Sequence, residues 1–190
     1  MKRLLILVLS VILSNGFIFS QCKMLTKPKH IKRLEKVIPL EIETATKYKI
    51  LFDKYYTVAN ISYCKTIDGN YFCLVPFTRA YSSRFEVFED QPIVFYLENG
   101  EEVTLHPVVN IDGRMIGLTK YNILLYYKAS REQLEKLASN FPVSLKIYFL
   151  AEKEISNSYM DDIGTYFEYE LHSNKYRNNV FDGANCILQY

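Results

Sequence analysis

The residues best suited to bind a metal ion lie near the end of the chain, in the pentapeptide EYELH. In an extended strand Glu168, Glu170 and His172 project from one face, while Phe167 and Leu171 project from the other. Two alternate positions can supply ligands to one ion, but three successive positions cannot easily converge, because the outer two stand roughly 13 Å apart. A polar outer face over an apolar inner face explains the same residues. We favour that interpretation, and we expect no cofactor.

The histidines offer one candidate general base. His30, His106 and His172 are too widely spaced in the sequence to suggest one set of metal ligands. His106 precedes Pro107 near a predicted strand end and is the candidate base, although an ordinary, partly exposed histidine is the preferred explanation. The sequence contains no G-x-S-x-G elbow, H-E-x-x-H pair, C-x-x-C motif or glycine-rich phosphate loop. These observations favour a non-catalytic protein and leave an enzyme as the alternative.

Paired acids occur at one further place, Asp161-Asp162. Neighbouring residues in a loop rarely point together, and an aspartate close to Gly164 is common in turns. This pair therefore predicts a turn.

Two of the four cysteines flank a turn signal in the stretch SYCKTIDGNYFCLV. Asp-Gly between two apolar-rich runs favours a hairpin with a two-residue type I′ turn, because glycine tolerates positive φ. With Asp68 and Gly69 at the tip, Cys64 faces Cys73 at a non-hydrogen-bonded pair, where Cα atoms lie roughly 4.5 to 5.5 Å apart. The sequence therefore predicts a Cys64–Cys73 disulfide. Two buried free thiols are the alternative.

The other two cysteines lie near the two ends of the chain. Four cysteines permit three full pairings, and we rank Cys64–Cys73 together with Cys22–Cys186 first. For Cys186 a buried thiol is the alternative, because no histidine partner can be identified for it.

The first 20 residues, MKRLLILVLSVILSNGFIFS, have the layout of a secretory signal peptide. Lys2 and Arg3 form a charged start, and residues 4–13 are an apolar core that is too short to span a bilayer by itself. Cleavage after residue 20 would leave the chain secreted or periplasmic, where an oxidising environment permits disulfides. A lipoprotein signal places a small residue before the lipidated cysteine, whereas Gln21 precedes Cys22. An outer-membrane lipoprotein anchored at Cys22 is therefore the disfavoured alternative.

The charge of the chain depends on this leader. The whole sequence has 23 Lys and Arg against 21 Asp and Glu, and the leader contains Lys2 and Arg3 but no acid. Residues 21–190 therefore carry 21 charges of each sign and have no bulk electrostatic attraction to nucleic acid. Their length suits a single domain with a proper core.

Residues 21–38 form a basic segment between the leader and the domain. Between Gln21 and Lys36 it has six Lys or Arg residues against Glu35 alone. Such a segment could contact an anionic membrane at about 1 kcal/mol per basic residue, but we favour a solvated tether. Ile31 to Ile38 could form a short helix before Pro39.

Strand patterns dominate residues 39–190, which we predict to be one β-rich domain. Pro76, in the run YFCLVPF, suggests an edge strand or a bulge. A second hairpin is predicted in IVFYLENGEEVTLHPV, where a type I′ turn at Asn99-Gly100 sets Tyr96 opposite Val103. Further strands are predicted in LTKYNILLYYKA, VSLKIYFLAEKE and GTYFEYELH.

One helix is inserted among these strands. Ser130 is its predicted N-cap, Gln133 completes a capping box, and Leu134, Leu137 and Ala138 form an apolar stripe. The tail NKYRNNVFDGANCILQY could form a C-terminal helix, which Asp182-Gly183 could break. The prediction is an α+β fold, mostly antiparallel, arranged as a sandwich or a partly open barrel.

Four segments carry a family resemblance: the leader ending IFSQ, the hairpin YLENGEEVTL, the stretch SREQLEKLASNFPVSLKIYF and the closing CIL. In these segments the chain resembles uncharacterised exported β-rich proteins of Bacteroidetes-type Gram-negative bacteria. The resemblance covers about half of the chain. It implies a periplasmic or surface setting and supplies no activity.

The function expected from the sequence is that of a non-catalytic cell-envelope module that binds a protein partner or packs into an assembly. An exposed sheet edge near Pro76 or an aromatic patch would be its contact surface. One alternative is a periplasmic hydrolase that uses His106 or the face of Glu168, Glu170 and His172. The other is a β-barrel that binds a small ligand in its mouth, which the 16 Tyr and 12 Phe residues suggest.

Overall fold

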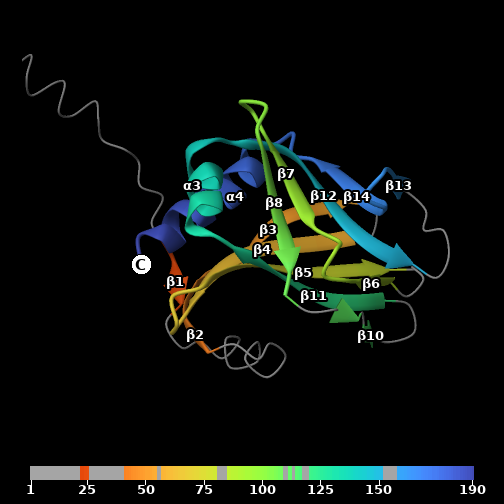
Figure 1. The fold of residues 1–190 in the computed structure, drawn as a ribbon, viewed down its shortest axis with the longest axis horizontal. Helices are drawn as coiled ribbons and strands as arrows, with labels where there is room; N and C mark the ends of the chain where they lie inside the picture. Colours follow the sequence, from red (N-terminus) through yellow and green to blue (C-terminus); the bar gives the residue numbers. More distant parts are fainter. Residues whose placement is uncertain are drawn as a thin grey trace, which may run out of the picture.

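The computed structural model describes residues 22–25, 41–54, 57–80, 85–108, 111–112, 114–116, 120–151 and 158–190 (Figure 1). The strands are β1 (Met24–Leu25), β2 (Ile42–Thr46), β3 (Lys49–Lys54), β4 (Thr57–Thr66), β5 (Tyr71–Ala80), β6 (Phe85–Val87), β7 (Ile93–Leu97), β8 (Glu102–Pro107), β9 (Ile111–Asp112), β10 (Arg114–Ile116), β11 (Lys120–Ala129), β12 (Pro142–Ala151), β13 (Tyr159–Met160) and β14 (Thr165–Glu170). The helices are α3 (Arg131–Ser139) and α4 (Asn174–Leu188). The predicted leader and the predicted helix at residues 31–38 lie outside the described residues.

The strands join into one strongly bent sheet. Their order is β1-β2-β4-β5-β11-β8-β7-β12-β14-β13, and β3, β6, β9 and β10 pair off this path. All pairings between described strands are antiparallel. The two halves of the sheet meet where β11 pairs with β8, over only two residue pairs. This narrow junction lets one half fold over the other (Figure 1).

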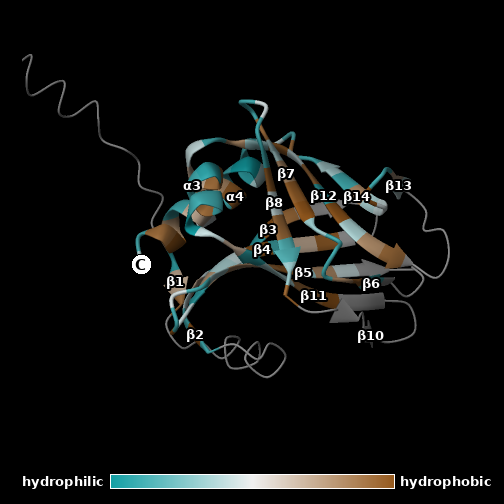
Figure 2. Ribbon diagram, viewed as in Figure 1, coloured by the Kyte–Doolittle hydropathy of each residue, from teal (hydrophilic) through white to brown (hydrophobic). Residues whose placement is uncertain are grey.

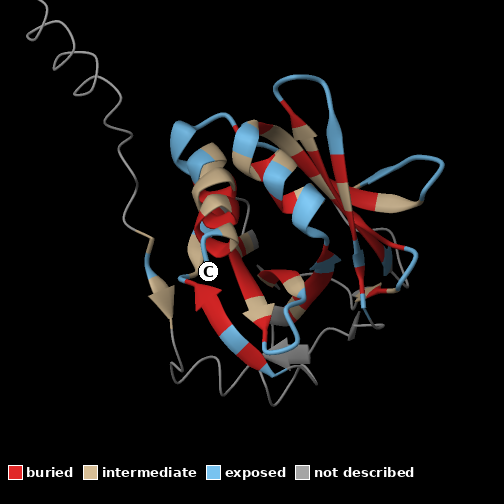
Figure 3. Ribbon diagram, turned by 60° about the vertical axis from the view of Figure 1, so that its left-hand side comes forward, coloured by how far each residue is buried: buried red, intermediate tan, exposed pale blue. Residues whose placement is uncertain are grey.

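The halves and the helices share one core. Phe167 of β14 stacks on Phe149 of β12 at 4.3 Å and on Phe77 of β5 at 5.7 Å between ring centroids, so it joins the two halves. The apolar strand centres and the helix faces turned toward them are buried, whereas the hairpin tips are polar and exposed (Figures 2 and 3). The α+β prediction is confirmed: the sheet is mostly antiparallel and not closed, and one helix is inserted and one is C-terminal.

Both hairpins differ from the prediction by one residue in register. Thr66 N–H donates to Asn70 O at 2.9 Å, and Gly69 N–H donates to Thr66 O, so the first loop contains three residues. Leu97, Gly100 and Glu101 make the same contacts in the second hairpin. Gly69 and Gly100 have φ of +79° and +82°, the left-handed conformation that closes three-residue loops. The predicted two-residue turns were wrong.

The one-residue change moves side chains between the faces of the sheet. Tyr96 lies opposite Glu102, and Val103 lies opposite Phe95. In the first hairpin Cys64 lies opposite Phe72, and Cys73 lies opposite Tyr63. Because successive side chains of a strand point to opposite faces, Cys64 and Cys73 are on different sides of the sheet.

Pro76 is in the interior of the sheet, so of the two predicted settings, an edge strand or a bulge, the edge strand was wrong. Its strand β5 is flanked by β4 on one side and by β11 on the other, and Pro76 pairs with Leu124 of β11. The β4–β5 register has a gap between the pairs Ala59–Phe77 and Ser62–Leu74, which is the place where proline has no N–H to donate. The sheet tolerates this interruption because the neighbouring pairs on both sides are formed.

The inserted helix follows its sequence signals. The Ser130 side chain accepts from Gln133 N–H, and the Gln133 side chain accepts from Ser130 N–H at 2.8 Å, which completes the predicted capping box. Leu134 and Leu137 are fully buried, and such burial stabilises by roughly 1.5–3 kcal/mol per leucine. Gln133 also donates to Thr104 O at 2.7 Å, which attaches the start of α3 to β8.

The C-terminal helix continues through Asp182-Gly183, where a break had been considered. Gly183 lies against the ring of Tyr63, and a Cβ at this position would stand 2.8 Å from two ring carbons. Glycine is therefore required here for close packing of α4 on β4. Figure 3 shows α4 with its buried face turned to the sheet, beside α3. None of the described helices is long and apolar enough to cross a membrane.

Candidate functional site

The predicted polar face of β14 is solvent-exposed. Glu168, Glu170 and His172 are exposed, while Phe167 and Leu171 are buried, as the alternation predicts. His172 Nε2 contacts Glu170 Oε2, and the two side chains are 80% and 64% exposed. Among the described residues no group of three His, Cys, Asp or Glu could hold a metal ion. The outer-face interpretation accounts for all three polar residues.

His106 lies elsewhere, on β8, where it is exposed and faces Lys128 of β11. In the strand order β8 and β14 are separated by β7 and β12. The fold therefore does not gather His106 with Glu168 and His172 into one site.

Of the two predicted disulfides, the long-range one is present. Cys22 and Cys186 are bonded, with 5.4 Å between their Cα atoms, so the prediction of this bridge is confirmed. It connects Cys22, which lies two residues before β1, to Cys186 in the last turns of α4. A disulfide of this kind forms and persists in oxidising compartments.

The predicted Cys64–Cys73 disulfide is wrong. Both residues are free and buried, and they lie on opposite faces of the sheet. Burial raises the pKa of the Cys64 thiol to about 12. Burial, together with the nearby Cys64, also raises the pKa of Cys73. The alternative of two buried thiols that pack as small apolar side chains is therefore confirmed.

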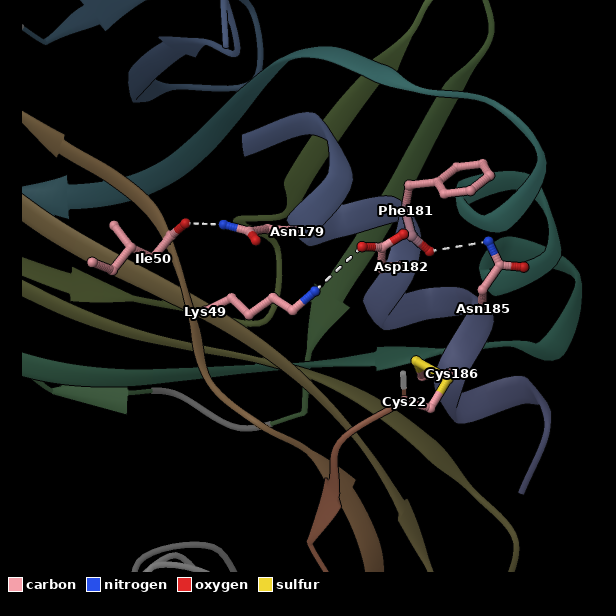
Figure 4. A network of polar contacts seen from close by, with 8 residues as sticks. All are labelled: Cys22, Lys49, Ile50, Asn179, Phe181, Asp182, Asn185 and Cys186. Atoms are coloured by element: carbon pink, nitrogen blue, oxygen red, sulfur yellow. Dashed lines mark hydrogen bonds and ion pairs between the residues drawn. A yellow bond between two sulfur atoms is a disulfide. The ribbon is translucent and has the colours of Figure 1, made fainter. Parts of the chain in front are cut away.

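The first candidate site is a pocket between α4 and strands β2 to β4, which we call the α4 pocket (Figure 4). Its volume is about 80 Å³. Its lining residues are Lys23, Thr46, Lys47, Lys49, Ile61, Asn179, Asp182, Gly183 and Cys186. Several of these residues carry polar or charged groups, but the atoms that face the pocket are almost all apolar.

Polar contacts hold α4 against β3 beside this pocket. Lys49 Nζ lies 3.4 Å from Asp182 Oδ2. The Asn179 side chain, which is buried, donates to the Ile50 backbone oxygen. Figure 4 shows both contacts crossing from the strand to the helix, with the disulfide one turn further along α4. The helix is therefore attached to β3 by one ion pair and one hydrogen bond.

The second candidate lies on the outer face of β12 and β14, and we call it the Lys146 cluster. Lys146 Nζ lies 3.2 Å from Asp161 Oδ2, and Tyr148 OH donates to the same oxygen at 2.7 Å. The ammonium group also lies 4.1 Å from the ring centroid of Tyr166 and 5.6 Å from that of Tyr96. Cation–π contacts of this kind add to the ion pair.

The surroundings of Lys146 and Asp161 favour the charged form of both side chains. Partial burial opposes the charge of Asp161, but hydrogen bonds from Tyr148, Ile163 N–H and Lys146 lower its carboxyl pKa below 3.8. Burial likewise opposes the charge of Lys146, but Asp161 and Tyr166 raise its pKa. Burial and the contact with Asp161 raise the pKa of Tyr148. All three groups are therefore held in their usual charge states near neutral pH, which suits a structural arrangement.

Beside the Lys146 cluster, β13 and the turn after it carry three exposed large apolar side chains, which we call the β13 patch. It consists of Tyr159, Met160 and Ile163, with 57%, 78% and 55% of their surface exposed. The Tyr159 ring lies 5.8 Å from that of Tyr166, so the patch continues into the Lys146 cluster. Large apolar side chains that are left exposed close together in the sequence are a feature of binding surfaces.

The sequence identified only part of these two sites. Asp161 forms the predicted turn, since its carboxylate accepts from Ile163 N–H at 3.0 Å. Its second role, as the partner of Lys146 and Tyr148, depends on pairing between β12 and β14 and has no local signal. The same holds for Lys49 and Asp182, which are 133 residues apart.

Comparisons with known proteins found no relative: no family model, no curated protein and no solved structure matches this chain.

Proposed function

We propose that this chain is an exported, non-catalytic module of the cell envelope that binds a protein partner. Export is supported by the hydrophobic leader at residues 1–20 and by the Cys22–Cys186 disulfide. The disulfide also argues against a lipid anchor, because lipid attachment at Cys22 would use the sulfur atom that bonds to Cys186. We therefore propose a secreted or periplasmic protein that is not lipid-anchored.

The observation that carries the binding role is the β13 patch. Met160 is the most exposed of the large apolar side chains of the described residues, and Tyr159 and Ile163 lie close to it in sequence. Leaving such side chains in water forgoes the stabilisation that burial would supply, roughly 1.5–3 kcal/mol each. A protein surface that covers them would recover that stabilisation.

The neighbouring Lys146 cluster holds the aromatic side chains next to this surface in fixed positions. Tyr148 is 1% exposed and Tyr166 is 9% exposed, and both are held by contacts to Asp161 or Lys146. Aromatic side chains that are fixed before binding lose little conformational entropy when a partner arrives. Tyrosine is also among the residue types enriched at protein interfaces.

The two alternative functions have less support. A hydrolase would need convergent groups, whereas His106 lies on β8 and is separated by β7 and β12 from Glu170 and His172 at the end of β14. A ligand site in a barrel mouth would need a cavity of roughly 300–1,000 Å³ lined mostly by apolar groups. The interior between the two halves of the sheet is instead filled by side chains such as Phe77, Phe149 and Phe167.

A site-specific photo-crosslinker at Tyr159 tests this proposal. We expect one protein adduct of discrete mass from envelope extracts of the producing cells, which is then identified and purified. The matched control carries the crosslinker at Ile67, which is 64% exposed at the tip of the β4–β5 hairpin. Identical adducts at both positions, or none at Tyr159, would contradict the proposal.

Binding to the purified partner gives the quantitative test. We expect Met160→Asp with Ile163→Asp to weaken the affinity at least about tenfold, since central apolar contacts contribute about 1 kcal/mol or more each. Ile67→Asp should leave the affinity unchanged. Equal affinities for all three proteins would show that the β13 patch is not the contact surface.

A further inference from the structure

The β4–β5 hairpin can close in two registers, and only one of them allows Cys64 and Cys73 to bond. In the folded chain the three-residue loop places Cys64 opposite Phe72. Cys73 lies opposite Tyr63, so the two thiols are on opposite faces of the sheet. A two-residue turn at Asp68-Gly69 would instead place Cys64 opposite Cys73, at a separation that a disulfide can bridge. A bond between them therefore requires the register that the folded chain does not have.

That other register would remove two large side chains from the main core. Tyr63 and Ile61 of β4 are buried in it, together with Cys73 of β5. Because a shift of one residue exchanges the faces of a strand, both β4 side chains would move to the opposite side relative to β5. Gly183 of α4 lies against the Tyr63 ring. The observed docking of α4 on β4 therefore depends on the register of the folded chain.

The docking of α4 in turn brings the two cysteines of the native bridge together. Cys186 is part of α4, whereas Cys22 lies two residues before β1. Their Cα atoms are 5.4 Å apart with α4 packed against β2, β3 and β4 (Figure 4). The native bridge and a bond between Cys64 and Cys73 therefore belong to two different arrangements of the chain.

In the unfolded chain, loop length favours the non-native bond. Cys64 and Cys73 are nine residues apart, whereas Cys22 and Cys186 are separated by 164. The probability that a flexible loop closes falls roughly as the −3/2 power of its length, so contact between Cys64 and Cys73 is favoured roughly 80-fold over the native contact. The other pairs that include Cys22 or Cys186 also close loops several times longer than the Cys64–Cys73 loop. The Asp-Gly turn signal favours the same short contact.

We propose that the two disulfides are mutually exclusive: a non-native Cys64–Cys73 bond forms first in the unfolded chain, and thiol–disulfide exchange breaks it before the native Cys22–Cys186 bridge forms. In the first step the two thiols lose two electrons and two protons to a disulfide oxidant such as oxidised glutathione, which becomes two thiols. The proposal does not depend on the β13 patch or on a protein partner.

The exchange that follows needs no further oxidant. The Cys22 thiolate attacks the Cys64 sulfur, the bond to Cys73 breaks, and Cys73 leaves as a thiolate that takes up a proton. The Cys186 thiolate then attacks the Cys22 sulfur and releases Cys64 in the same way. One disulfide replaces another, so no electrons are gained or lost overall. Folding then buries both released thiols, which prevents them from reversing the exchange.

This reaction sequence makes the chain a substrate for catalysts of thiol–disulfide exchange. A free thiol such as reduced glutathione attacks the Cys64–Cys73 bond directly and is released when a cysteine thiolate displaces it. A reduced thiol should therefore accelerate formation of the native bridge, although the bridge itself is an oxidised product.

Oxidative refolding of the complete chain tests the proposal. The reduced, unfolded protein is diluted from denaturant into oxidised glutathione, with or without reduced glutathione. Samples are alkylated at successive times, and the disulfides are located by peptide mass spectrometry. We expect Cys64–Cys73 to be the first and most abundant bond and Cys22–Cys186 to increase as it disappears. Reduced glutathione should accelerate this second phase several-fold.

The matched variant is Cys64→Ala with Cys73→Ala, which cannot form the early bond. We expect it to form Cys22–Cys186 without the delay, at a rate that reduced glutathione does not increase. A second measurement needs no variant: the wild-type species that holds only Cys64–Cys73 is isolated, and its amide hydrogen exchange is measured. Its β4 and α4 amides should lack the protection of the native protein and should gain it after reduced glutathione is added.

The outcomes decide for or against the proposal. Conversion of the Cys64–Cys73 species into the Cys22–Cys186 species, faster with reduced glutathione, supports it. The proposal is overturned if Cys22–Cys186 forms first, or if a folded species holds both bonds. It is also overturned if the isolated Cys64–Cys73 species has native protection, or if the double variant forms the native bridge with the same delay as wild type.

Discussion

Cys64 and Cys73 lie on adjacent strands but on opposite faces of the sheet. Cys64 packs in a cluster with Ile42, Phe72 and Tyr126, whereas Cys73 lies in the main core. The three-residue loop that ends at Gly69 produces this separation, because it shifts the pairing by one residue relative to a two-residue turn. The register of this hairpin therefore determines the redox state of both cysteines.

The loop conformations can be tested at their glycines. A Cβ at Gly69 or Gly100 would meet no atom within 4 Å, so Gly→Ala at either position reports only the cost of positive φ. We expect each substitution to lower the free energy of unfolding by about 1 kcal/mol, as measured by urea denaturation. Gly→Asn should cost less because asparagine tolerates this conformation. Equal costs for alanine and asparagine would contradict the assigned loops.

The two buried thiols should be unreactive in the folded chain. Burial raises the pKa of Cys64 to about 12, and that of Cys73 is raised as well, so neither forms appreciable thiolate near neutral pH. We expect a thiol reagent to label no cysteine in the native protein and two after unfolding without reductant. Labelling of all four, or of none, in the unfolded and unreduced chain would contradict the disulfide assignment.

The disulfide should contribute strongly to stability. Cys22 and Cys186 are 164 residues apart, and the loop-entropy model gives about 4–5 kcal/mol for closing such a long loop. We expect Cys22→Ser with Cys186→Ser to lower the free energy of unfolding by an amount of this order. A reductant should destabilise the unsubstituted protein but leave the double variant unchanged. If the reductant had no effect on either protein, the bridge would be absent.

Gly183 should be intolerant of even one methyl group. Alanine favours helices over glycine by about 1 kcal/mol, so an exposed Gly→Ala change would stabilise α4. Here the added Cβ would stand 2.8 Å from the Tyr63 ring, and overpacking costs roughly 1–3 kcal/mol. We expect Gly183→Ala to lower the melting temperature, and to do so much less in a Tyr63→Leu background. The same loss in both backgrounds would show that the ring contact is not the cause.

The Lys146 cluster should make stability depend on acid pH. The folded chain holds the pKa of Asp161 below its ordinary 3.8, so the folded state binds a proton at Asp161 more weakly than the unfolded state does. This stabilisation is complete above pH 3.8 and is lost as the pH falls through the folded pKa. We expect Asp161→Asn to lower the free energy of unfolding by about 1–3 kcal/mol at neutral pH, because Tyr148 and Lys146 lose a charged partner.

The measurement is chemical denaturation of both proteins across a range of pH. The difference between wild type and Asp161→Asn should shrink as the pH falls below 3.8. Asp162→Asn is the matched control, because this exposed neighbour has no contact with Lys146 or Tyr148 among the described residues. A difference that stays constant with pH would show that the charge of Asp161 is not involved.

The sequence by itself determined the features that depend on near neighbours along the chain. The capping box at Ser130 and Gln133, the alternation of β14 and the existence of both hairpins follow from local hydrogen bonding and from strand geometry. Such features depend on residues that are close along the chain, so the local sequence predicts them without knowledge of the rest of the fold.

Only the tertiary structure decided the register of the hairpins and the contacts between distant segments. Two- and three-residue loops share the same Asp-Gly or Asn-Gly signal, and the choice between them reverses which side chains enter the core. Lys146 meets Asp161, and Lys49 meets Asp182, because strand pairing and the docking of α4 bring them together. Contacts of this kind are set by the packing of the whole sheet, and no local pattern encodes them.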